Sequence, residues 1–379
     1  MTRATPPPWL LLALASCATQ GGVSNGGVNL PSSGVGPFRP LVDGELVPQA
    51  VTPYVLGDSQ AQYREPDVVG TSDDPTSAAV WMYAVATVKG AAVVVRTRAD
   101  DARSFYGDAA DNADTTHPRH EPPTVLAASD PWEGTDLGGP CAVRSGGQVL
   151  LYYGAAGGIG VAASPDGDGL TFTKHGAPVL AAGGGGGWET SAPRAPSVAV
   201  FPDGTWHMLY AAGDSIGEAT SADGIAWTRV GADPVLGPSA PVDPSTLGPG
   251  EQPPFDEGGV DDPVIAPQTN VDGRLQVRVL YTGYRDAAGS MGSAPRRSAI
   301  GLAGRFGDAG ALTKQAAPVF TVQLHERAPG FFEYAGGSLL YVGEDDTSQS
   351  TTQPFQGIGA AYAPVGGRLP APLPFPATP

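Results

Sequence analysis

Cysteine is almost absent from this sequence, which contains only two among its 379 residues. One of them, Cys17, lies close to the start of the chain, so Cys141 remains as a single free thiol. A disulfide framework is therefore excluded. Cys141 lies in an apolar stretch that we expect to form an inner strand, and we predict that its thiol is buried and inert.

Basic residues are also scarce. The chain has 21 Lys and Arg against 38 Asp and Glu, which gives a formal net charge of −17. Nucleic acids and anionic membrane surfaces would repel such a protein, so we exclude both as partners. The charge favours solubility and gives no information about the fold.

Motifs for metals and phosphate groups are missing as well. The five histidines show no spacing of the His-x-x-x-His kind. The glycine run from Gly183 to Gly187 has no lysine after it, unlike a phosphate-binding loop. We therefore predict neither a metal site nor a cofactor from the motifs.

The apolar run at the N-terminus, Trp9 to Leu14, is too short for a permanent membrane span. Together with Arg3 and with Leu14-Ala15-Ser16-Cys17, it predicts a signal peptide over 1–17 that ends in a bacterial lipobox, with Cys17 lipidated. An ordinary secretory signal cleaved nearby is the alternative. The next residue, Ala18, is not a retention Asp. We therefore expect a lipid-anchored protein of the bacterial cell envelope, at the outer membrane or cell surface, which contacts the membrane through its lipid alone.

Glycine and proline, by contrast, are abundant, with 54 and 39 residues. This share without a collagen period indicates either disorder or many short strands joined by tight turns. We predict a flexible Gly-, Ser- and Asn-rich tether over 18–37 and a loose Pro-rich tail over 367–379. Between them, over 38–366, repeated strand patterns favour the tight turns.

A four-part pattern occurs five times in that region. It consists of an apolar stretch that begins at a proline, a Leu-Tyr strand, an Ile-Gly-x-Ala strand and a Val-Leu ending, with a few weak copies. The prolines are Pro66, Pro140, Pro196, Pro263 and Pro329, and the tyrosines are Tyr83, Tyr152, Tyr210, Tyr281 and Tyr341. A repeat of about 60 to 70 residues with four short strands is typical of a propeller blade. The sequence thus predicts an all-β fold, a five-bladed β-propeller with four-stranded blades.

The fifth copy has no fourth strand after Ile358. One appears early instead, as Pro53-Tyr54-Val55-Leu56, before the first copy begins. A ring leaves no open sheet edge only if its last blade is completed by a strand from the other end of the chain. We therefore predict that Val51 to Leu56 is the outer strand of the fifth blade and closes the ring.

Two copies contain an Asp-Gly turn before the last strand. These are Asp166-Gly167 and Asp223-Gly224, followed by Phe172 and Trp227. Asp accepts backbone N–H groups and Gly permits a positive φ, so both turns predict hairpins. We expect the aromatic side chains to pack between blades and both Asp residues to be structural.

The fourth copy resembles a known family. Its stretch Phe255 to Ile265, followed by Tyr281-Thr282-Gly283 and by Ile300 to Ala303, resembles the five-bladed propeller glycoside hydrolases. These are the arabinanase, levansucrase and invertase group, including families 43, 32, 68 and 62. The resemblance implies an oligo- or polysaccharide partner at the central channel, a monomer, and the possibility of a calcium ion in the channel.

In the resembled enzymes the acids just before the inner-strand prolines perform the chemistry, with an Asp, a second Asp and a Glu from three successive blades. Here the residues at these positions are Glu65, Gly139, Ala195, Asp262 and Ala328. If the protein is a hydrolase, the resemblance implies Asp262 as base or nucleophile and Glu65 as acid. The alternative is a non-catalytic propeller that binds glycans or another surface and has lost the acids of the family.

Arginines stand close to the same prolines. The residues two positions before each proline are Arg64, Gly138, Arg194, Asp261 and Arg327. Three Arg at one channel mouth are costly unless they pair with acids or with an anionic ligand. Pairing with Glu65, Asp261 and Asp262 is one interpretation. The other is an anionic sugar, with Arg64, Arg194, Arg327, Asp261 and the nearby His325 as substrate-binding residues.

A second set of acids lies seven residues before three of the prolines. These are Glu133, Glu189 and Asp256, and each follows an aromatic residue. The recurrence favours loop anchors that accept backbone N–H groups. The alternative is that some of them line the funnel.

Overall fold

The computed structural model describes most of the repeat region. The described residues are 39–42, 45–46, 54–56, 63–74, 76–102, 105, 122–266, 269–271, 274–290, 296–321, 325–334, 337–346 and 355–364. The predicted signal peptide with Cys17, the tether over 18–37 and the tail over 367–379 lie outside them. No helix in the described part is long and apolar enough to cross a membrane.

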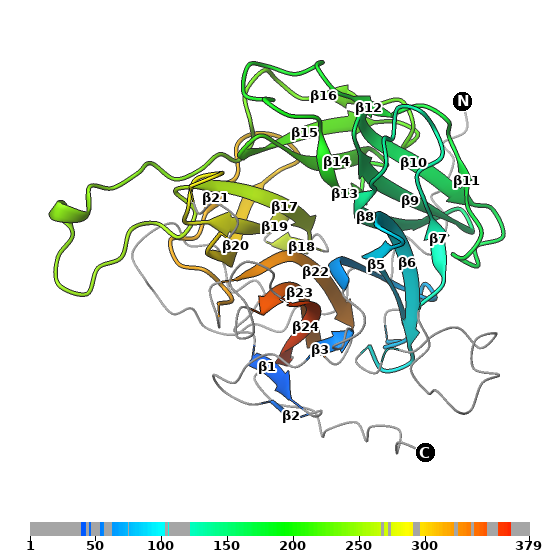
Figure 1. The fold of residues 1–379 in the computed structure, drawn as a ribbon, viewed down its shortest axis with the longest axis horizontal. Coiled ribbons are helices and arrows are strands. Elements are labelled where there is room, and N and C mark those ends of the chain that lie inside the picture. Colours follow the sequence, from blue (N-terminus) through cyan, green and yellow to red (C-terminus); the bar gives the residue numbers. More distant parts are fainter. Residues whose placement is uncertain are drawn as a thin grey trace.

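Five antiparallel sheets surround a common centre, so the predicted five-bladed propeller is confirmed (Figure 1). Blade one contains β4 (Tyr63–Gly70), β5 (Val80–Val88), β6 (Ala91–Ala99) and β7 (Thr124–Leu126). Blade two contains β8 (Gly138–Ser145), β9 (Gln148–Ala155), β10 (Gly158–Ser164), β11 (Thr173–Lys174) and β12 (Leu180–Ala181). Blade three contains β13 (Arg194–Val200), β14 (Trp206–Ala212), β15 (Ser215–Ser221) and β16 (Thr228–Arg229).

Blades four and five follow along the chain. Blade four contains β17 (Gly259–Ile265), β18 (Thr269–Val271), β19 (Arg274–Tyr284), β20 (Ser298–Phe306) and β21 (Thr313–Lys314). Blade five contains β22 (Glu326–Tyr334), β23 (Gly337–Asp346) and β24 (Phe355–Pro364). A short 3-10 helix, η3 (Pro244–Thr246), lies in the connection between blades three and four. The inner strands β4, β8, β13, β17 and β22 contact one another in that order, and β22 contacts β4 again.

The N-terminal part of the chain closes the ring, as predicted. β3 (Tyr54–Leu56) pairs antiparallel with β24, with Leu56 opposite Ile358. Residues 51–53 of the predicted strand lie outside the described residues. An additional hairpin of β1 (Arg39–Val42) and β2 (Glu45–Leu46) joins the same sheet, because β1 also pairs with β24. Blade five is thus completed by three N-terminal strands, β1, β2 and β3, of which the sequence pattern indicated one.

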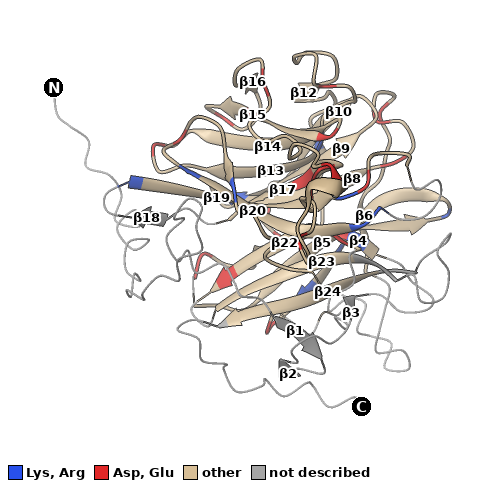
Figure 2. Cartoon of the chain, turned by 90° about the vertical axis from the view of Figure 1, so that its left-hand side faces the viewer, with Lys and Arg blue, Asp and Glu red and all other residues tan. Residues whose placement is uncertain are grey.

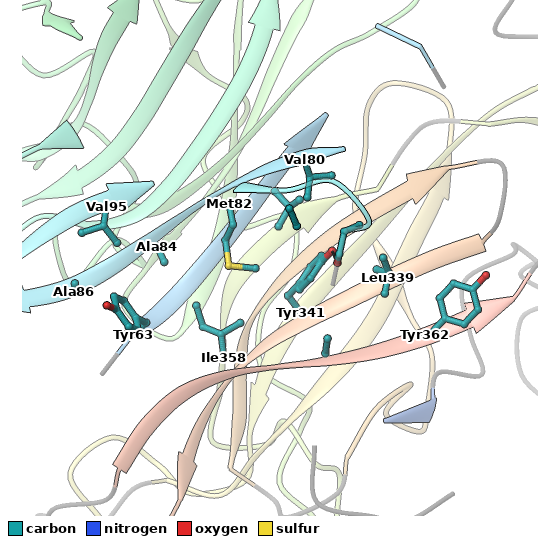
Figure 3. Packing of buried hydrophobic residues seen from close by; sticks show 14 of the residues in the cluster. Tyr63, Val80, Met82, Ala84, Ala86, Val95, Leu339, Tyr341, Ile358 and Tyr362 are labelled. Atoms are coloured by element: carbon teal, nitrogen blue, oxygen red, sulfur yellow. Dashed lines mark hydrogen bonds between the residues drawn. The ribbon is translucent and has the colours of Figure 1, made fainter. Parts of the chain in front are cut away.

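The seam between blades five and one is a continuous apolar layer. Met82 of β5 packs in one buried cluster with Tyr63 of β4, Leu339 and Tyr341 of β23, and Ile358 of β24. Figure 3 shows side chains from both blades pointing into this layer. Burial of a large apolar side chain contributes roughly 1.5–3 kcal/mol, so the seam holds the first and last blades together without a covalent link.

The five tyrosines of the repeat do not occupy one equivalent position. The second-strand residues that pair with the residue after each proline are Tyr83, Tyr152, Leu209, Leu280 and Tyr341. Tyr210 and Tyr281 lie one residue later, where blade two has Tyr153. Because successive side chains of a strand point to opposite faces, the Leu-Tyr motif contains two different kinds of tyrosine.

The first kind joins neighbouring blades. The Tyr83 hydroxyl donates to the carbonyl of Gly169 in blade two at 2.9 Å, and the Tyr152 hydroxyl donates to the carbonyl of Gly224 in blade three at 2.8 Å. Phe172 packs edge-on against the ring of Tyr83, and Trp227 packs in the same way against Tyr152. The predicted packing of these two aromatic residues between blades is confirmed.

The loop that contains the predicted turn of blade two is longer than its counterpart in blade three. Asp168 Oδ1 accepts the N–H of Leu170 at 2.9 Å, as Asp223 Oδ1 accepts the N–H of Ile225 at 2.8 Å. The structural equivalent of Asp223-Gly224 is therefore Asp168-Gly169, whereas Asp166-Gly167 forms a turn of its own, in which Gly167 has a φ of 64° and its N–H donates to the carbonyl of Ser164 at 3.1 Å. The loop is longer, since the serine that begins it is Ser164, four residues before Asp168.

The second kind of tyrosine holds a buried acid within its own blade. The hydroxyls of Tyr153, Tyr210 and Tyr281 donate to Glu133, Glu189 and Asp256 at 2.7, 2.6 and 3.0 Å. Each acid also pairs with a cation of the fourth strand, and these pairs are Lys174 with Glu133, Arg229 with Glu189 and Lys314 with Asp256. The acids are thus anchors and are almost fully buried. We expected backbone N–H groups as partners of all three acids. In the described part of the chain, such groups donate to Glu133 alone.

The Ile-Gly-x-Ala motif follows from this arrangement. In blade three, Gly217 lies opposite Tyr210, whose ring stacks on Trp188 at a centroid distance of 6.0 Å. A Cβ atom on Gly217 would lie 2.5 Å from Trp188 Cη2 and 2.6 Å from Tyr210 Cζ. Only glycine leaves room for the two stacked rings, which explains why the motif requires it.

We expect Gly217→Ala to lower the free energy of unfolding by about 1–3 kcal/mol, because the added methyl group forces two packed rings to move. Gly187→Ala is a matched control, since no described atom lies within 4 Å of its added Cβ. Its effect should be within about 0.5 kcal/mol. Denaturant unfolding of both variants tests this, and equal losses would contradict the packing explanation.

Candidate functional site

The five inner strands share one irregularity at the repeated prolines. In every blade the pairing between the first and second strands shifts at the X-Pro step, as between Arg64 and Asp67 in blade one. The residues before the prolines all adopt positive φ: Glu65 (54°), Gly139 (51°), Ala195 (45°), Asp262 (46°) and Ala328 (48°). For the four that are not glycine, this left-handed conformation costs about 1–3 kcal/mol each.

These bulges turn the pre-proline residues towards the centre of the ring. All five line one small pocket together with their prolines and with Asp67, Ser197 and Val264. The pocket has an empty volume of about 330 Å³, but the centre of a water-sized sphere can occupy only about 30 Å³ of it. This is room for about two water molecules. A group much larger than two water molecules therefore cannot enter the pocket and could bind only at its mouth.

Glu65 is firmly positioned in the pocket. Its Oε2 accepts the backbone N–H of Gly139 in blade two at 2.6 Å, and its Oε1 accepts the Nε of Arg64 at 3.2 Å. A Cβ atom on Gly138 would lie only 2.9 Å from Glu65 Oε2. The glycines of blade two, one of which replaces an acid expected from the resemblance, thus make room for the carboxylate of blade one.

Asp262 lies on the same pocket in a different environment. The hydroxyl of Thr282 donates to its Oδ2 at 3.0 Å, and its own N–H donates to Asp261 Oδ1 at 2.9 Å. The residue as a whole is partly buried and lines the pocket. Burial, with the negative charges of Asp261 and Glu65, raises the pKa of Asp262 from the usual 3.8 to about 7. Asp262 can therefore hold a proton near neutral pH.

Two of the arginines near the channel, Arg194 and Arg64, are paired with acids. Arg194 Nη2 lies 2.6 Å from Asp261 Oδ2, and it also donates to the carbonyl of Gly213. Arg64 pairs with Glu65, as described above. The positive charges of Arg327 and Arg194 act against the rise in the pKa of Asp262. For Arg194 and Arg64, the geometry matches the pairing interpretation rather than an unpaired anionic site.

The residues expected to bind substrate lie beside the pocket rather than in it. Arg64, Arg194, Arg327, Asp261 and His325 are absent from its described lining. His325 forms an isolated parallel bridge with Ser298 at the junction of blades four and five, and its Nδ1 is buried. The structure therefore brings Glu65 and Asp262 together and leaves His325 apart from them.

A third carboxyl group on the pocket, Asp67, was missed by the sequence analysis. Its Oδ2 accepts the N–H of Ala142 in blade two at 2.7 Å. The equivalent residue Cys141 accepts the N–H of Val198 in blade three, and Ser197 does the same for Ile265 in blade four. Asp67 thus belongs to a series of links between inner strands, and its role is structural. Cys141 is buried, as predicted.

Burial raises the pKa of Asp67 from the usual 3.8 to about 7, against the opposing effect of the Ala142 N–H. The stability that a raised pKa supplies is complete below about pH 4 and is lost as the pH rises through about 7. One pKa unit corresponds to about 1.4 kcal/mol. Because Asp67 keeps some surface open to the channel, we count about half of the rise, or about 2 kcal/mol.

We therefore expect Asp67→Asn to raise the free energy of unfolding by about 2 kcal/mol at pH 8, because the amide cannot ionise and its oxygen still accepts the Ala142 N–H. The gain should shrink towards pH 4. Denaturant unfolding of the variant and of the unchanged protein across this range measures the difference between their free energies of unfolding. The titration of Asp262 contributes equally to both proteins and does not affect this difference. A difference that does not vary with pH would contradict this explanation.

Two further residues near Asp262 were also missed. Thr282 of β19 is buried beside it, and Tyr284 ends the same strand. The guanidinium of Arg296 lies 3.9 Å from the centre of the Tyr284 ring. Burial and the charges of Asp262 and Asp261 raise the pKa of Tyr284 above its usual value. Thr282-Gly283 belongs to the stretch that carries the family resemblance, which was the only signal for Thr282 in the sequence.

The described part of the chain shows neither a basic face in the view of Figure 2 nor a candidate metal site. Figure 2 shows Lys and Arg lying among Asp and Glu in this view rather than forming one basic face. In the described part of the chain, no group of three or more His, Cys, Asp and Glu could hold a metal ion.

Comparison with known proteins gives structural relatives only. No protein-family model matches the sequence, and no curated protein matches it. A structure from work on the GH130 family of mannoside phosphorylases has a TM-score of 0.57 at 16% identity, covering 91% of this chain and 99% of the other. A thermostable family-43 glycoside hydrolase has a TM-score of 0.57 at 13% identity, covering 86% and 99%. A GH43 subfamily 1 enzyme from Xanthomonas citri has a TM-score of 0.52 at 15% identity, covering 83% and 91%.

These similarities establish the fold. The chain is a five-bladed β-propeller of the kind found in glycoside hydrolases, and it spans nearly the full length of each of these structures. The first of them comes from work describing glycoside hydrolases that target β-1,2 mannosidic linkages in Candida mannan. At such low identity the similarity does not extend to individual site residues.

Proposed function

We propose that this protein is a glycoside hydrolase whose chemistry is carried out by Asp262 and Glu65 at the central pocket. The observation that carries the proposal is the meeting of two carboxyl groups from blades one and four, one of which has a pKa near 7. Pairs of acids in contrasting environments are typical of glycoside hydrolysis. The structural relatives support a carbohydrate as the substrate.

The surroundings of the two carboxyl groups favour the reverse of the acid and base roles that the resemblance implied for Asp262 and Glu65. Asp262, which was expected as base or nucleophile, is the group that can hold a proton near neutral pH. Glu65, which was expected as the acid, accepts hydrogen bonds from Arg64 and from the Gly139 N–H at its two oxygens. We therefore assign Asp262 as the proton donor and Glu65 as the carboxylate that faces the anomeric carbon.

The reaction balances with these two groups and one water. Asp262 gives its proton to the glycosidic oxygen, and the bond from that oxygen to the anomeric carbon breaks with its electron pair left on the oxygen. Water supplies the new hydroxyl group to the carbon, and Glu65 accepts the other water proton when it acts as base. If Glu65 acts first as nucleophile, the same water hydrolyses the resulting ester, and Asp262 receives the proton.

The proposal also covers the cellular location, the oligomeric state and the substrate class of the protein. We propose an extracytoplasmic lipoprotein anchored through Cys17 in the bacterial envelope, at the outer membrane or the cell surface, and acting as a monomer. The substrate is an oligo- or polysaccharide bound at the mouth of the channel, close to Arg194, Arg327 and Asp261. The lipobox and the signal-peptide pattern support the anchor.

A second function is favoured by one feature of the pocket. Three of its five pre-proline positions are Gly139, Ala195 and Ala328, which have no functional group. This side-chain-poor pocket also fits a module that binds glycans without cleaving them, in which Glu65 and Asp262 only fix the blades. The two functions differ in a simple way, because only the hydrolase releases new reducing ends.

The test is a panel of neutral and acidic polysaccharides incubated with the protein at pH 6, with reducing ends and bound glycan both measured. The proposal expects new reducing ends from at least one polysaccharide. Binding without release would overturn the hydrolase and favour the binding module. Neither binding nor release across the panel would overturn both.

A further inference from the structure

We propose that Thr282 is a positioning residue that directs the acid proton of Asp262 onto one defined oxygen, Oδ1. This inference rests on the proposed role of Asp262 as proton donor. Thr282 lies on the second strand of blade four and is fully buried. It does not line the pocket, so it acts on the reaction only through Asp262.

The hydrogen bonds around Thr282 form a directed chain. The backbone N–H of Ala328, the pre-proline residue of blade five, donates to Thr282 Oγ1 at 2.8 Å. The hydroxyl of Thr282 donates in turn to Asp262 Oδ2 at 3.0 Å. A hydroxyl has one hydrogen to donate, and the backbone N–H can only donate. The fixed backbone donor therefore leaves the hydroxyl hydrogen for Asp262.

This direction decides which carboxyl oxygen carries the proton. Because Oδ2 receives a hydrogen from Thr282, it acts as acceptor, and the proton of the neutral acid belongs on Oδ1. Among the described residues, none is hydrogen bonded to Oδ1. A general acid must present its proton to the leaving oxygen at hydrogen-bond distance, so fixing the proton on the unengaged oxygen orients the acid for transfer.

The same residue links the acid to blade five. Ala328 is one of the strained pre-proline residues, and its N–H is held by the same hydroxyl that orients Asp262. On the other side of Asp262, its own N–H donates to Asp261, which pairs with Arg194 of blade three. The acid is thus positioned from both neighbouring blades.

Several charges act on Asp262 besides this hydroxyl. The carboxylates of Asp261 and Glu65 favour its neutral form, whereas the guanidinium groups of Arg327 and Arg194 favour its ionised form. Tyr284 also interacts with it electrostatically. A change at Thr282 leaves all of these charges in place, so its effect reports the loss of the hydroxyl with its two hydrogen bonds, to Asp262 and from the Ala328 N–H.

The experiment measures the ionisation of Asp262, which the Thr282 hydroxyl must affect if it donates to the carboxyl group, and it needs no substrate. In full-length protein labelled with 13C at the Asp side-chain carboxyl carbons, the Asp262 signal is assigned by its loss in Asp262→Asn and is followed from pH 4 to 9. Thr282→Val should move the midpoint of its titration upwards by about one unit, because the ionised form loses a donor. Thr282→Ser keeps the hydroxyl and should titrate as the unchanged protein does.

The Asp67 signal in the same spectra serves as the internal control for the fold. If Thr282→Val fails to fold, Thr282→Ala provides the same measurement. An unchanged midpoint in the variant without the hydroxyl would overturn the inference, and so would an equal shift in Thr282→Ser. Because no turnover is required, these outcomes are independent of whether the protein hydrolyses any glycan.

Discussion

Replacing Asp262 by asparagine should lower kcat/KM for glycan hydrolysis by about 10²–10⁴-fold, the range that general acid catalysis contributes. Asparagine fills the same space and can still accept the Thr282 hydroxyl, but it has no acid proton to give. Substrate binding at the mouth should therefore change little. Initial rates of reducing-end release, measured for both proteins on the polysaccharide that the panel identifies, test this expectation.

Two comparisons separate this effect from simple damage to the fold. Asp203→Asn changes an exposed acid in the β13–β14 turn, where Asp203 accepts the N–H of Thr205 at 2.9 Å, and should leave the rate unchanged. In an aryl glycoside of the same sugar with an acidic phenol as leaving group, the leaving oxygen needs little protonation. On this substrate Asp262→Asn should therefore retain most of the rate of the unchanged protein. An equal loss on both substrates would contradict the role of proton donor.

The second large effect concerns stability and lies away from the pocket. Arg305 of β20 reaches across to Glu218 of blade three, with Nη2 2.6 Å from Oε1 and Nη1 2.7 Å from Oε2. His207 lies 2.8 Å from the same Oε1, and only 5% of the Arg305 side chain and 1% of the Glu218 side chain are exposed. Burial alone would raise the pKa of Glu218, but the hydrogen bonds from His207 and Arg305 outweigh it and lower that pKa.

We expect Arg305→Met to lower the free energy of unfolding by about 3–5 kcal/mol, because it leaves Glu218 buried without its main partner. Arg297→Met is a matched control, since Arg297 pairs with Asp286 at the same 2.6 Å but with 43% of its side chain exposed. That change should cost less than about 1 kcal/mol. Denaturant unfolding of both variants provides the measurement, and similar losses would show that burial of the pair is unimportant.

Removing both partners should restore much of the loss. In a variant that combines Arg305→Met with Glu218→Leu, the carboxylate that Arg305 neutralised is gone as well, and buried ion pairs replaced by apolar groups are often close to neutral. His207 would keep its stacking on Phe201, whose ring lies 3.8 Å away. A double variant as unstable as Arg305→Met alone would indicate that packing of Arg305, and not the charge left on Glu218, is responsible.

The blade pattern could be predicted because it depends on local rules. The ring-closing strand at Tyr54 to Leu56 followed from the missing strand after Ile358, and the packing of Trp227 between blades followed from its place after a hairpin. Such features repeat along the chain, and each copy supports the others. Where a copy differs in length, as in blade two, the residues equivalent to Asp223-Gly224 lie two positions after the predicted turn.

The pocket could be predicted only in part. The pre-proline positions identified Glu65 and Asp262, because five equivalent bulges bring these positions together. Asp67 and Thr282 escaped notice because their roles depend on contacts between blades, which no pattern within one blade reveals. The sequence alone could not assign the roles that we propose for the two acids, since the pKa of Asp262 depends on burial and on neighbours from other blades.

The dependence of kcat/KM on pH tests the central claim most directly. If Asp262 donates the proton, activity on the natural glycan should fall as the pH rises through about 7, since the acid loses its proton there. This fall should disappear from the residual activity of Asp262→Asn. A profile that is flat through pH 7, or one that keeps the same fall in Asp262→Asn, would contradict the assignment of Asp262 as the acid of a hydrolytic centre.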